Sequence, residues 1–181
     1  MPDNNKLYVI GGISRTGKSK IATQTKIRHE SIEILGTDAF RRNGNNDQAW
    51  LNLIDHLRKT TFNGDVLIEG VAITPQRVHQ LALDHFILER AVFLGYGRES
   101  HADTILACAR REPEADWVAG QLRVNPNYEN EVRNWMPPGT RESSELKEEA
   151  NKYSYGYFDI TDYPIFEEYV SAVTTYLLLE G

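Results

Sequence analysis

The residues whose types and spacing most clearly indicate chemistry lie near the start of the chain. They form the run Gly12-Ile13-Ser14-Arg15-Thr16-Gly17-Lys18-Ser19, which fits the pattern G-x-x-x-x-G-K-[ST]. An apolar segment, 7–10, precedes the run, and a segment suited to a helix follows it. Glycines at such a turn let backbone N–H groups and the helix N-terminus converge on a polyanion. The run therefore predicts a site for a nucleoside triphosphate, with Lys18 at the β- and γ-phosphates and the Ser19 hydroxyl on Mg²⁺.

Acidic residues follow two other apolar segments. Glu69 ends the segment 66–68, and Asp38 comes shortly after the segment 32–35. In an open parallel sheet, ligands bind outside the carboxyl ends of the strands, so both carboxylates are expected beside the phosphate site. Glu69 is expected to order magnesium waters or to hold a substrate hydroxyl, and both roles stay open. Asp38 would accept the proton of an acceptor hydroxyl or orient it.

Arginines supply the candidate anion contacts. Arg41 follows Asp38 by three residues and is expected to bind a phosphate or carboxylate of the acceptor, although an Asp-Arg pair at a turn is the simpler alternative. Arg110, at the end of a predicted helix, is the candidate for neutralising the γ-phosphate during transfer. The helix dipole also favours basic residues in a last turn. Arg111 shares this position with Arg110, and Arg42 fits a surface position as well as a site position. Weaker candidates of the same kind as Arg110 are Arg98, Arg123, Arg133 and Arg141.

The elements that must position these groups alternate along the chain. Apolar runs at 7–10, 32–35, 66–68, 91–94 and 155–160 predict strands. Between them, apolar residues at helical spacing predict helices over 18–28, 47–60, from 75 onward and over 99–111. Asp162 is expected to cap a last helix whose apolar residues recur from 166 to 177. This alternation indicates the α/β class, with a parallel sheet covered by helices.

The stretch from 112 to 141 interrupts the alternation. It contains two tryptophans, four prolines and several arginines without a clear period. A long excursion between strands predicts a lid or an insertion, with a plain surface connection as the alternative. From Thr140 to Lys152 the spacing of apolar residues indicates a return to helix before the last strand.

Bulk properties restrict the function classes. The 181 residues suit a single domain, and 40% hydrophobic with 25% charged residues is ordinary globular composition. A net charge of −6 without a basic block argues against a nucleic-acid partner. No apolar run approaches membrane-spanning length and no signal sequence is evident, so we expect a cytoplasmic protein without a membrane partner. The single cysteine, Cys108, excludes an internal disulfide.

These features together resemble the small P-loop kinases built like nucleoside monophosphate kinases. The matching parts are the phosphate-binding run, 37–42, 66–75 and 157–161. The two middle segments look most like 2-phosphoglycerate kinase, and zeta-toxin-like kinases share the general plan. The resemblance implies a three-layer P-loop NTPase sandwich with a five-stranded parallel sheet in order 2-3-1-4-5. It also implies ATP and Mg²⁺ as cofactors at Lys18 and Ser19, and an acceptor near Asp38 and Arg41.

The leading hypothesis is therefore an ATP-dependent kinase that phosphorylates a small, anionic metabolite. A GTP-dependent switch is disfavoured because the nearest match to the guanine signature N-K-x-D, at 151–154, has Ser154 where Asp is needed. An ATPase or regulator without a small-molecule acceptor is the alternative, and Arg41 beside Asp38 argues mildly against it. The acceptor's identity, the choice of ATP over GTP and the oligomeric state stay open.

Overall fold

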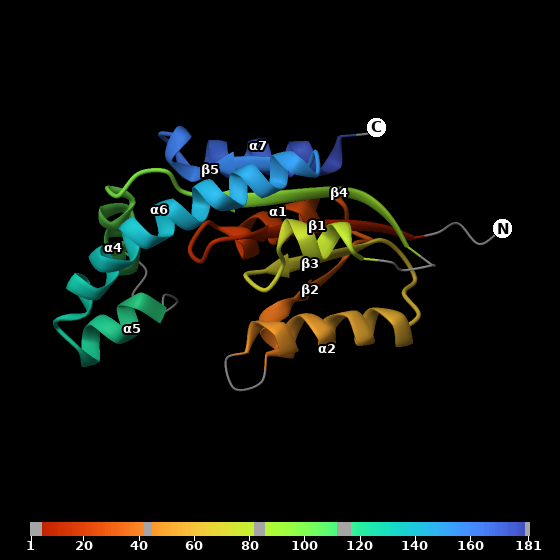
Figure 1. Cartoon of the computed structure of the whole chain (residues 1–181), viewed down its shortest axis with the longest axis horizontal. Helices are drawn as coiled ribbons and strands as arrows, with labels where there is room; N and C mark the ends of the chain where they lie inside the picture. The colour runs from red at the N-terminus through yellow and green to blue at the C-terminus, as the bar shows by residue number, and fades with distance from the viewer. Residues whose placement is uncertain (1–4, 42–44, 82–85, 112–116, 180–181) are drawn as a thin grey trace.

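A five-stranded, all-parallel sheet in the order β2-β3-β1-β4-β5 forms the centre of the computed structural model (Figure 1). The structure describes residues 5–41, 45–81, 86–111 and 117–179. The strands are β1 (Asn5–Gly12), β2 (Glu33–Gly36), β3 (Val66–Gly70), β4 (Phe86–Gly95) and β5 (Gly156–Asp159). The helices are α1 (Lys18–Arg28), α2 (Asn46–Lys59), α3 (Pro75–His79), α4 (His101–Arg111), α5 (Trp117–Val124), α6 (Tyr128–Lys152) and α7 (Phe166–Leu178), with short 3-10 turns η1 (Thr37–Phe40) and η2 (Ile160–Asp162). The predicted fold class and strand order are confirmed.

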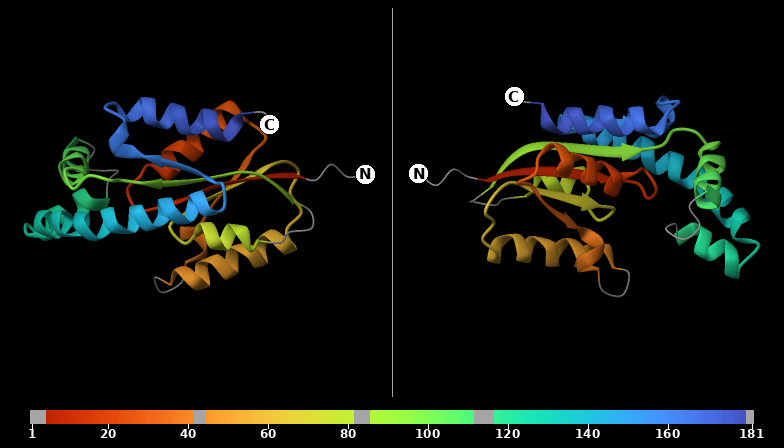
Figure 2. Two further views of the ribbon diagram at one scale, coloured as in Figure 1. Left: turned by 45° about the horizontal axis from the view of Figure 1, so that its top comes forward. Right: turned by 180° about the vertical axis from the view of Figure 1, so that it is seen from behind.

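Helices cover both faces of the sheet, which completes the three layers (Figure 2). Side chains of β1, β3 and β4 alternate between the two faces, as period-two geometry requires. One face packs against α2, α3 and the end of α6, with a core that includes Val9, Leu53, Ile68, Val78 and Ala150. The other face packs against α1 and α7, with a core that includes Ile10, Ile21, Leu67, Tyr169 and Val173. The continuous apolar character of the central strands follows from this burial on both sides.

A third apolar cluster lies beyond the carboxyl end of the sheet. It joins α4, α5 and the first half of α6, which project from the three layers in Figures 1 and 2. The stretch 112–141, in which the sequence shows no clear period, is helical over 117–124 and from 128 onward. Residues 112–116 lie outside the described residues. The return to helix comes earlier than Thr140, because α6 already begins at Tyr128.

Helix α6 continues through Pro137 and Pro138. A proline removes a backbone hydrogen bond and costs about 3 kcal/mol in a helix interior, so packing must compensate for this pair. Both prolines are exposed, whereas Met136 and Gly139 beside them are buried. A side chain at Gly139 would collide with Tyr96, since a Cβ atom there would lie 2.3 Å from the tyrosine hydroxyl.

The prediction that Asp162 caps the last helix is wrong. Asp162 ends the 3-10 turn η2, and α7 begins four residues later at Phe166, after Ile165 without a side-chain cap. Asp159 instead accepts hydrogen bonds from the backbone N–H and the hydroxyl of Thr161, at 2.9 and 2.6 Å. The turn η2 is therefore stabilised from the end of β5.

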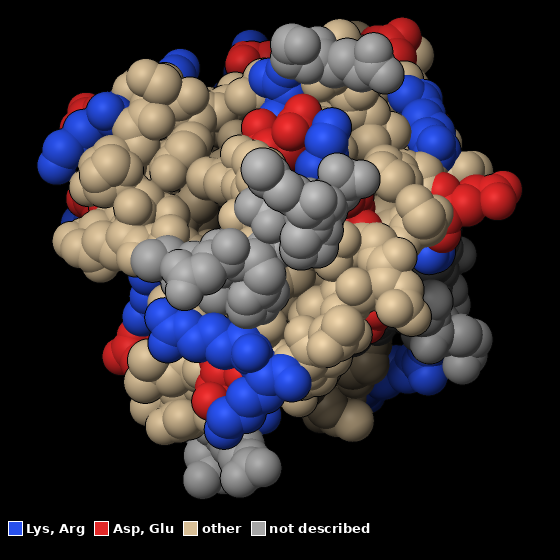
Figure 3. All heavy atoms as spheres, turned by 90° about the vertical axis from the view of Figure 1, so that its right-hand side faces the viewer, with Lys and Arg blue, Asp and Glu red and all other residues tan. Residues whose placement is uncertain are grey.

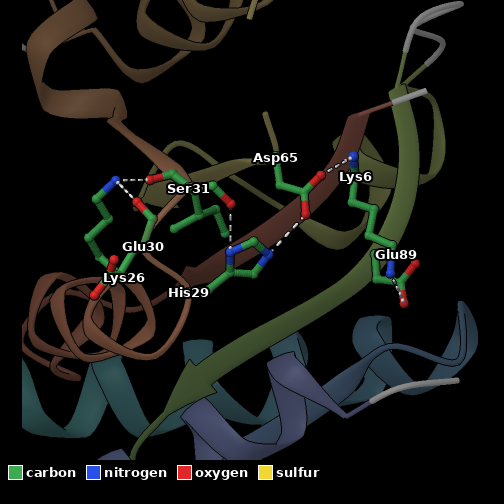
Figure 4. Close-up of polar contacts among 8 residues, drawn as sticks. Lys6, Lys26, His29, Glu30, Ser31, Asp65 and Glu89 are labelled. Atoms are coloured by element: carbon green, nitrogen blue, oxygen red, sulfur yellow. Dashed lines mark hydrogen bonds and ion pairs between the residues drawn. The ribbon is translucent and has the colours of Figure 1, made fainter. Parts of the chain in front are cut away.

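Polar contacts tie the opposite, amino end of the sheet together (Figure 4). The Asp65 carboxylate, just before β3, accepts from the Lys6 backbone N–H at 2.8 Å and lies 3.0 Å from His29 Nε2. His29 Nδ1 in turn lies 3.2 Å from the Ser31 hydroxyl. On this face of the molecule, acidic and basic side chains are interspersed rather than gathered into one basic surface (Figure 3). Among the described residues, no helix is both long enough and apolar enough to cross a membrane.

Candidate nucleotide and acceptor site

The phosphate-binding run forms a tight loop between β1 and α1. Gly12 and Gly17 have φ values of 130° and 80°, and Arg15 has φ 69°. A Cβ atom at Gly12 would lie 2.2 Å from the carbonyl oxygen of Leu94, so only glycine fits beside β4. The Thr16 hydroxyl donates to the Ile13 carbonyl at 2.8 Å, and the Tyr169 hydroxyl donates to the Thr16 carbonyl at 3.0 Å. The loop is thus stabilised by a hydrogen bond within itself and by one from α7.

Lys18 is buried within this loop, with 8% of its surface exposed. Its Nζ atom donates to the Ile13 carbonyl at 2.6 Å. Burial lowers the pKa of Lys18 to about 8, although the carboxylates of Glu69 and Asp38 act in the opposite direction. No described carboxylate forms an ion pair with this buried ammonium group, which fits a site for a bound anion, because phosphate oxygens would supply negative charge in direct contact.

Ser19 and Glu69 meet across the junction of α1 and β3. The Ser19 hydroxyl donates to Glu69 Oε1 at 3.2 Å. Burial raises the pKa of Glu69, while Lys18 and the Ser19 hydrogen bond lower it and Asp38 raises it. In the sheet register Glu69 pairs with Gly36, where a Cβ atom would lie 3.1 Å from Oε1. A hydroxyl and a carboxylate side by side are the oxygen ligands that Mg²⁺ uses, so the pair fits the ion.

The turn η1, which contains Asp38 and is followed directly by Arg41, leads from the end of β2 to this site. Gly70, with φ 150°, approaches η1 so closely that a Cβ atom would lie 1.8 Å from Thr37 Oγ1. The Asp38 side chain is 81% exposed, and its Oδ1 lies 3.1 Å from Nη2 of the mainly buried Arg41 side chain. The Nε and Nη2 atoms of Arg41 are buried and have no hydrogen-bond partner, so the contact with Asp38 is an ion pair without hydrogen-bond geometry.

A cleft of about 1080 Å³ opens beside the first half of the loop. Its floor includes Gly12, Ile13 and the segment after β3, and its walls come from the η1–α2 side and from α6. The wall residues on α6 are Asn134, Trp135, Pro138, Gly139, Glu142, Glu145, Leu146, Glu148, Glu149 and Lys152, and those on the other side are Arg41 and Asn46. Of the predicted acceptor residues, Arg41 lines the cleft directly.

Arg110 is placed differently from the other candidates. It lies on α4, and its Nη2 donates to Glu129 Oε2 at 2.7 Å. It does not line the cleft, and its contact with the γ-phosphate stays a prediction. Among the weaker candidates, Arg133 pairs with Asp103 and Glu129, while Arg42 and the side chain of Arg111 lie outside the described part.

One residue near the loop escaped the sequence prediction. His101 begins α4, is 5% exposed and packs on the Tyr96 ring, with centroids 5.1 Å apart. It also forms a hydrogen bond with the backbone of Arg15, which partly opposes the lowering of its pKa by burial. In sequence it is an isolated histidine 86 positions after Arg15, so no local pattern predicts this contact.

Comparisons with known proteins add little to this geometry. No family model matches the chain, and no curated protein matches it. One similar solved structure is a gluconokinase from Sinorhizobium meliloti 1021, with 16% identity, coverage of 69% of this chain and 74% of that chain, and a TM-score of 0.43. Another is APE1195, with 14% identity, coverage of 97% and 96%, and a TM-score of 0.49. Likenesses this distant carry no argument about function, which must come from the site itself.

Proposed function

We propose that the protein is an ATP-dependent kinase that transfers the γ-phosphoryl group to a hydroxyl of a small acceptor. The proposal rests on one arrangement: a phosphate-binding loop with a buried lysine opens onto a cleft that an arginine from the neighbouring turn also lines. A loop that only hydrolysed ATP would not need this arginine, because water requires no anion contact. An ATPase without an acceptor is the alternative that the test below separates.

The loop supplies the nucleotide contacts in this proposal. Backbone N–H groups from Gly12 to Ser19 and the N-terminus of α1 would surround the phosphates, with Lys18 against the β- and γ-phosphates. The Ser19 hydroxyl would bind Mg²⁺, with Glu69 as its second oxygen group or as the ligand of its waters. When bound, Mg²⁺ would neutralise phosphate charge, as it does generally in phosphoryl transfer.

The acceptor side uses Asp38 and Arg41. The acceptor hydroxyl oxygen forms a bond to the γ-phosphorus, and the bond from that phosphorus to the β–γ bridging oxygen breaks, releasing ADP. The hydroxyl proton passes to the Asp38 carboxylate, which is exposed and thus able to return it to solvent. Arg41 binds an anionic group of the acceptor, and Arg110 remains the candidate for the γ-phosphate after leaving Glu129.

The test measures ADP release from ATP and Mg²⁺ with and without a panel of hydroxyl-bearing metabolites. A kinase releases ADP rapidly only with an acceptor, whereas an ATPase is equally active without one. Asp38→Asn should then lower kcat and keep ATP affinity, because proton acceptance matters near the transition state. Arg41→Ala should raise the acceptor KM about ten- to hundredfold, the range of a charge-assisted contact.

Matched controls lie on the exposed side of α2. Asp55→Asn and Arg58→Ala make the same chemical changes away from the cleft, and both should behave like wild type. If Arg41→Ala leaves the acceptor KM and kcat unchanged, a neutral acceptor or the ATPase alternative is preferable.

A further inference from the structure

The acceptor cleft carries opposite charges on opposite walls. Arg41 follows β2, and α6 leads into β5; these two strands form the two edges of the sheet. The walls that they contribute therefore face each other across the ends of β3, β1 and β4. We propose that the acceptor is a zwitterion, in which an anionic group binds Arg41 and an ammonium group binds the glutamates of α6. This inference rests on the proposed kinase function and names the substrate class of the same site.

The wall on α6 is strongly acidic. Glu142, Glu145 and Glu149 recur at intervals of three and four residues, which places them along one side of the helix, and Glu148 joins them at the cleft. None of the four forms an ion pair with another described residue. Lys152 is the one base that this wall contributes within the described residues. Together with Arg41, the charged lining residues that the structure describes are four carboxylates and two bases, with a net charge of −2.

Arg41 gives an independent indication that a ligand binds. Its Nε and Nη2 atoms are buried and lack hydrogen-bond partners, and buried donors left unsatisfied are costly. Its ion-pair partner, Asp38, is 81% exposed and interacts without hydrogen-bond geometry. An acceptor carboxylate or phosphate would satisfy these nitrogens.

The charge distribution distinguishes between classes of acceptor. A polyanion would gain one arginine contact and meet repulsion from four glutamates. A neutral polyol would satisfy glutamate oxygens through its hydroxyls and leave Arg41 without an anion. A molecule with both an ammonium and an anionic group complements both walls, and charge-assisted hydrogen bonds are roughly twice as strong as neutral ones. Electrostatic complementarity therefore favours hydroxy amino acids or acidic amino sugars.

The test compares each amino compound with a partner that carries hydrogen or a hydroxyl group in place of the amino group. Suitable pairs are homoserine with 4-hydroxybutyrate, serine with glycerate, glucosaminate with gluconate, and glucosamine 6-phosphate with glucose 6-phosphate. The inference predicts that at least one amino compound is phosphorylated with kcat/KM about tenfold or more above that of its partner. A desamino compound that is used as well or better overturns it, and so does a panel in which no amino compound is used.

A double substitution locates the effect on α6. Glu145→Gln/Glu149→Gln should raise the KM for the best amino compound about ten- to hundredfold and leave kcat nearly unchanged, since ammonium binding is shared by ground and transition states. The same variant should leave the KM of the desamino partner unchanged or lower it. Glu30→Gln/Glu33→Gln removes the same charge at the amino end of the sheet and should match wild type. An unchanged KM in the cleft variant contradicts the role of this wall.

The failure of this inference can be distinguished from failure of the proposed function. Binding of a non-hydrolysable ATP analogue with Mg²⁺ is measured by calorimetry in parallel. If the analogue binds and a purely anionic or neutral acceptor is phosphorylated, the kinase function stands and the zwitterion is wrong. If no analogue binds, or ADP release is independent of every acceptor, the kinase proposal itself fails.

Discussion

Lys18 should destabilise the protein in the absence of nucleotide, so replacing it with a neutral side chain should stabilise the fold. The ammonium group is buried against one carbonyl oxygen, and burial lowers its pKa from 10.5 to about 8. At neutral pH the group is charged in both the folded and the unfolded protein, and the folded protein bears the desolvation cost. Lys18→Met keeps an unbranched side chain of similar length and removes that charge.

The size of the effect follows from the pKa change. A fall from 10.5 to about 8 corresponds to about 3 kcal/mol of unfavourable free energy at neutral pH. The substitution also loses the hydrogen bond to Ile13, worth about 1 kcal/mol. The Ile13 carbonyl keeps a second donor, the Thr16 hydroxyl at 2.8 Å, so it is not left without a partner. We expect a net gain of about 1–2 kcal/mol, or a Tm increase of a few degrees in a chain of this size.

The pH dependence gives the sign of the effect. The folded pKa lies below the unfolded one, so between pH 8 and 10.5 the unfolded chain binds more protons and this group's contribution to stability rises with pH. The advantage of Lys18→Met should therefore be greatest below pH 8 and disappear above pH 10.5. Urea unfolding of both proteins across this range measures it, with the exposed Lys20→Met as control. A destabilised Lys18→Met variant, or a gain independent of pH, would refute the reasoning.

Three further outcomes are expected at the site. Glu69→Gln should keep nucleotide binding and lose most phosphoryl transfer. In wild type, kcat/KM should fall with decreasing pH at a higher pH than for an ordinary carboxylate, because burial raises the pKa of Glu69 in the free enzyme and only the carboxylate acts. Ser19→Ala should raise the Mg²⁺ concentration needed for half-maximal activity, and an unchanged Mg²⁺ titration would exclude Ser19 as a ligand. Gly70→Ala should destabilise by more than about 1 kcal/mol, since φ is 150° and Thr37 blocks the Cβ position; Gly120→Ala, which meets no atom within 4 Å, is its control in thermal unfolding.

Local sequence patterns predicted most of what lies along the sheet. The apolar segments before Gly12 and Glu69 are short and buried on both faces, so they appear as continuous apolar runs that end at the functional residues. The loop run itself fixes a strand before it and a helix after it. The rule that ligands bind at the carboxyl ends of parallel strands then predicted that Glu69 lies at the phosphate site, and Glu69 does lie beside Ser19.

The region around α6 could not be predicted in the same way, because its packing depends on small residues. The buried side of the helix includes Gly139 and Ser143, which carry no apolar signal, and two prolines interrupt the expected period. The buried Ser143 hydroxyl is satisfied there, because it accepts a hydrogen bond from the Tyr96 backbone N–H at 3.0 Å. The acidic wall was missed for a related reason: charges at helical spacing look like a solvated surface until the tertiary fold brings a cleft against them.

The perturbed charges at the loop argue that the site is arranged for a ligand rather than for stability. Lys18 bears a desolvation cost that the carboxylates of Glu69 and Asp38 offset only in part, and Glu69 bears one that the Ser19 hydroxyl and the Lys18 ammonium group oppose. Arg110 shows the contrast, because its guanidinium is exposed and already paired with Glu129. Movement of Arg110 onto a phosphate would exchange one ion pair for another with little net cost, since exposed pairs contribute about 0–1 kcal/mol. Glu69 and Asp38 offset the cost at Lys18 only in part, and an anion entering the loop would relieve the rest, so binding of a polyphosphate is the event that this part of the fold favours.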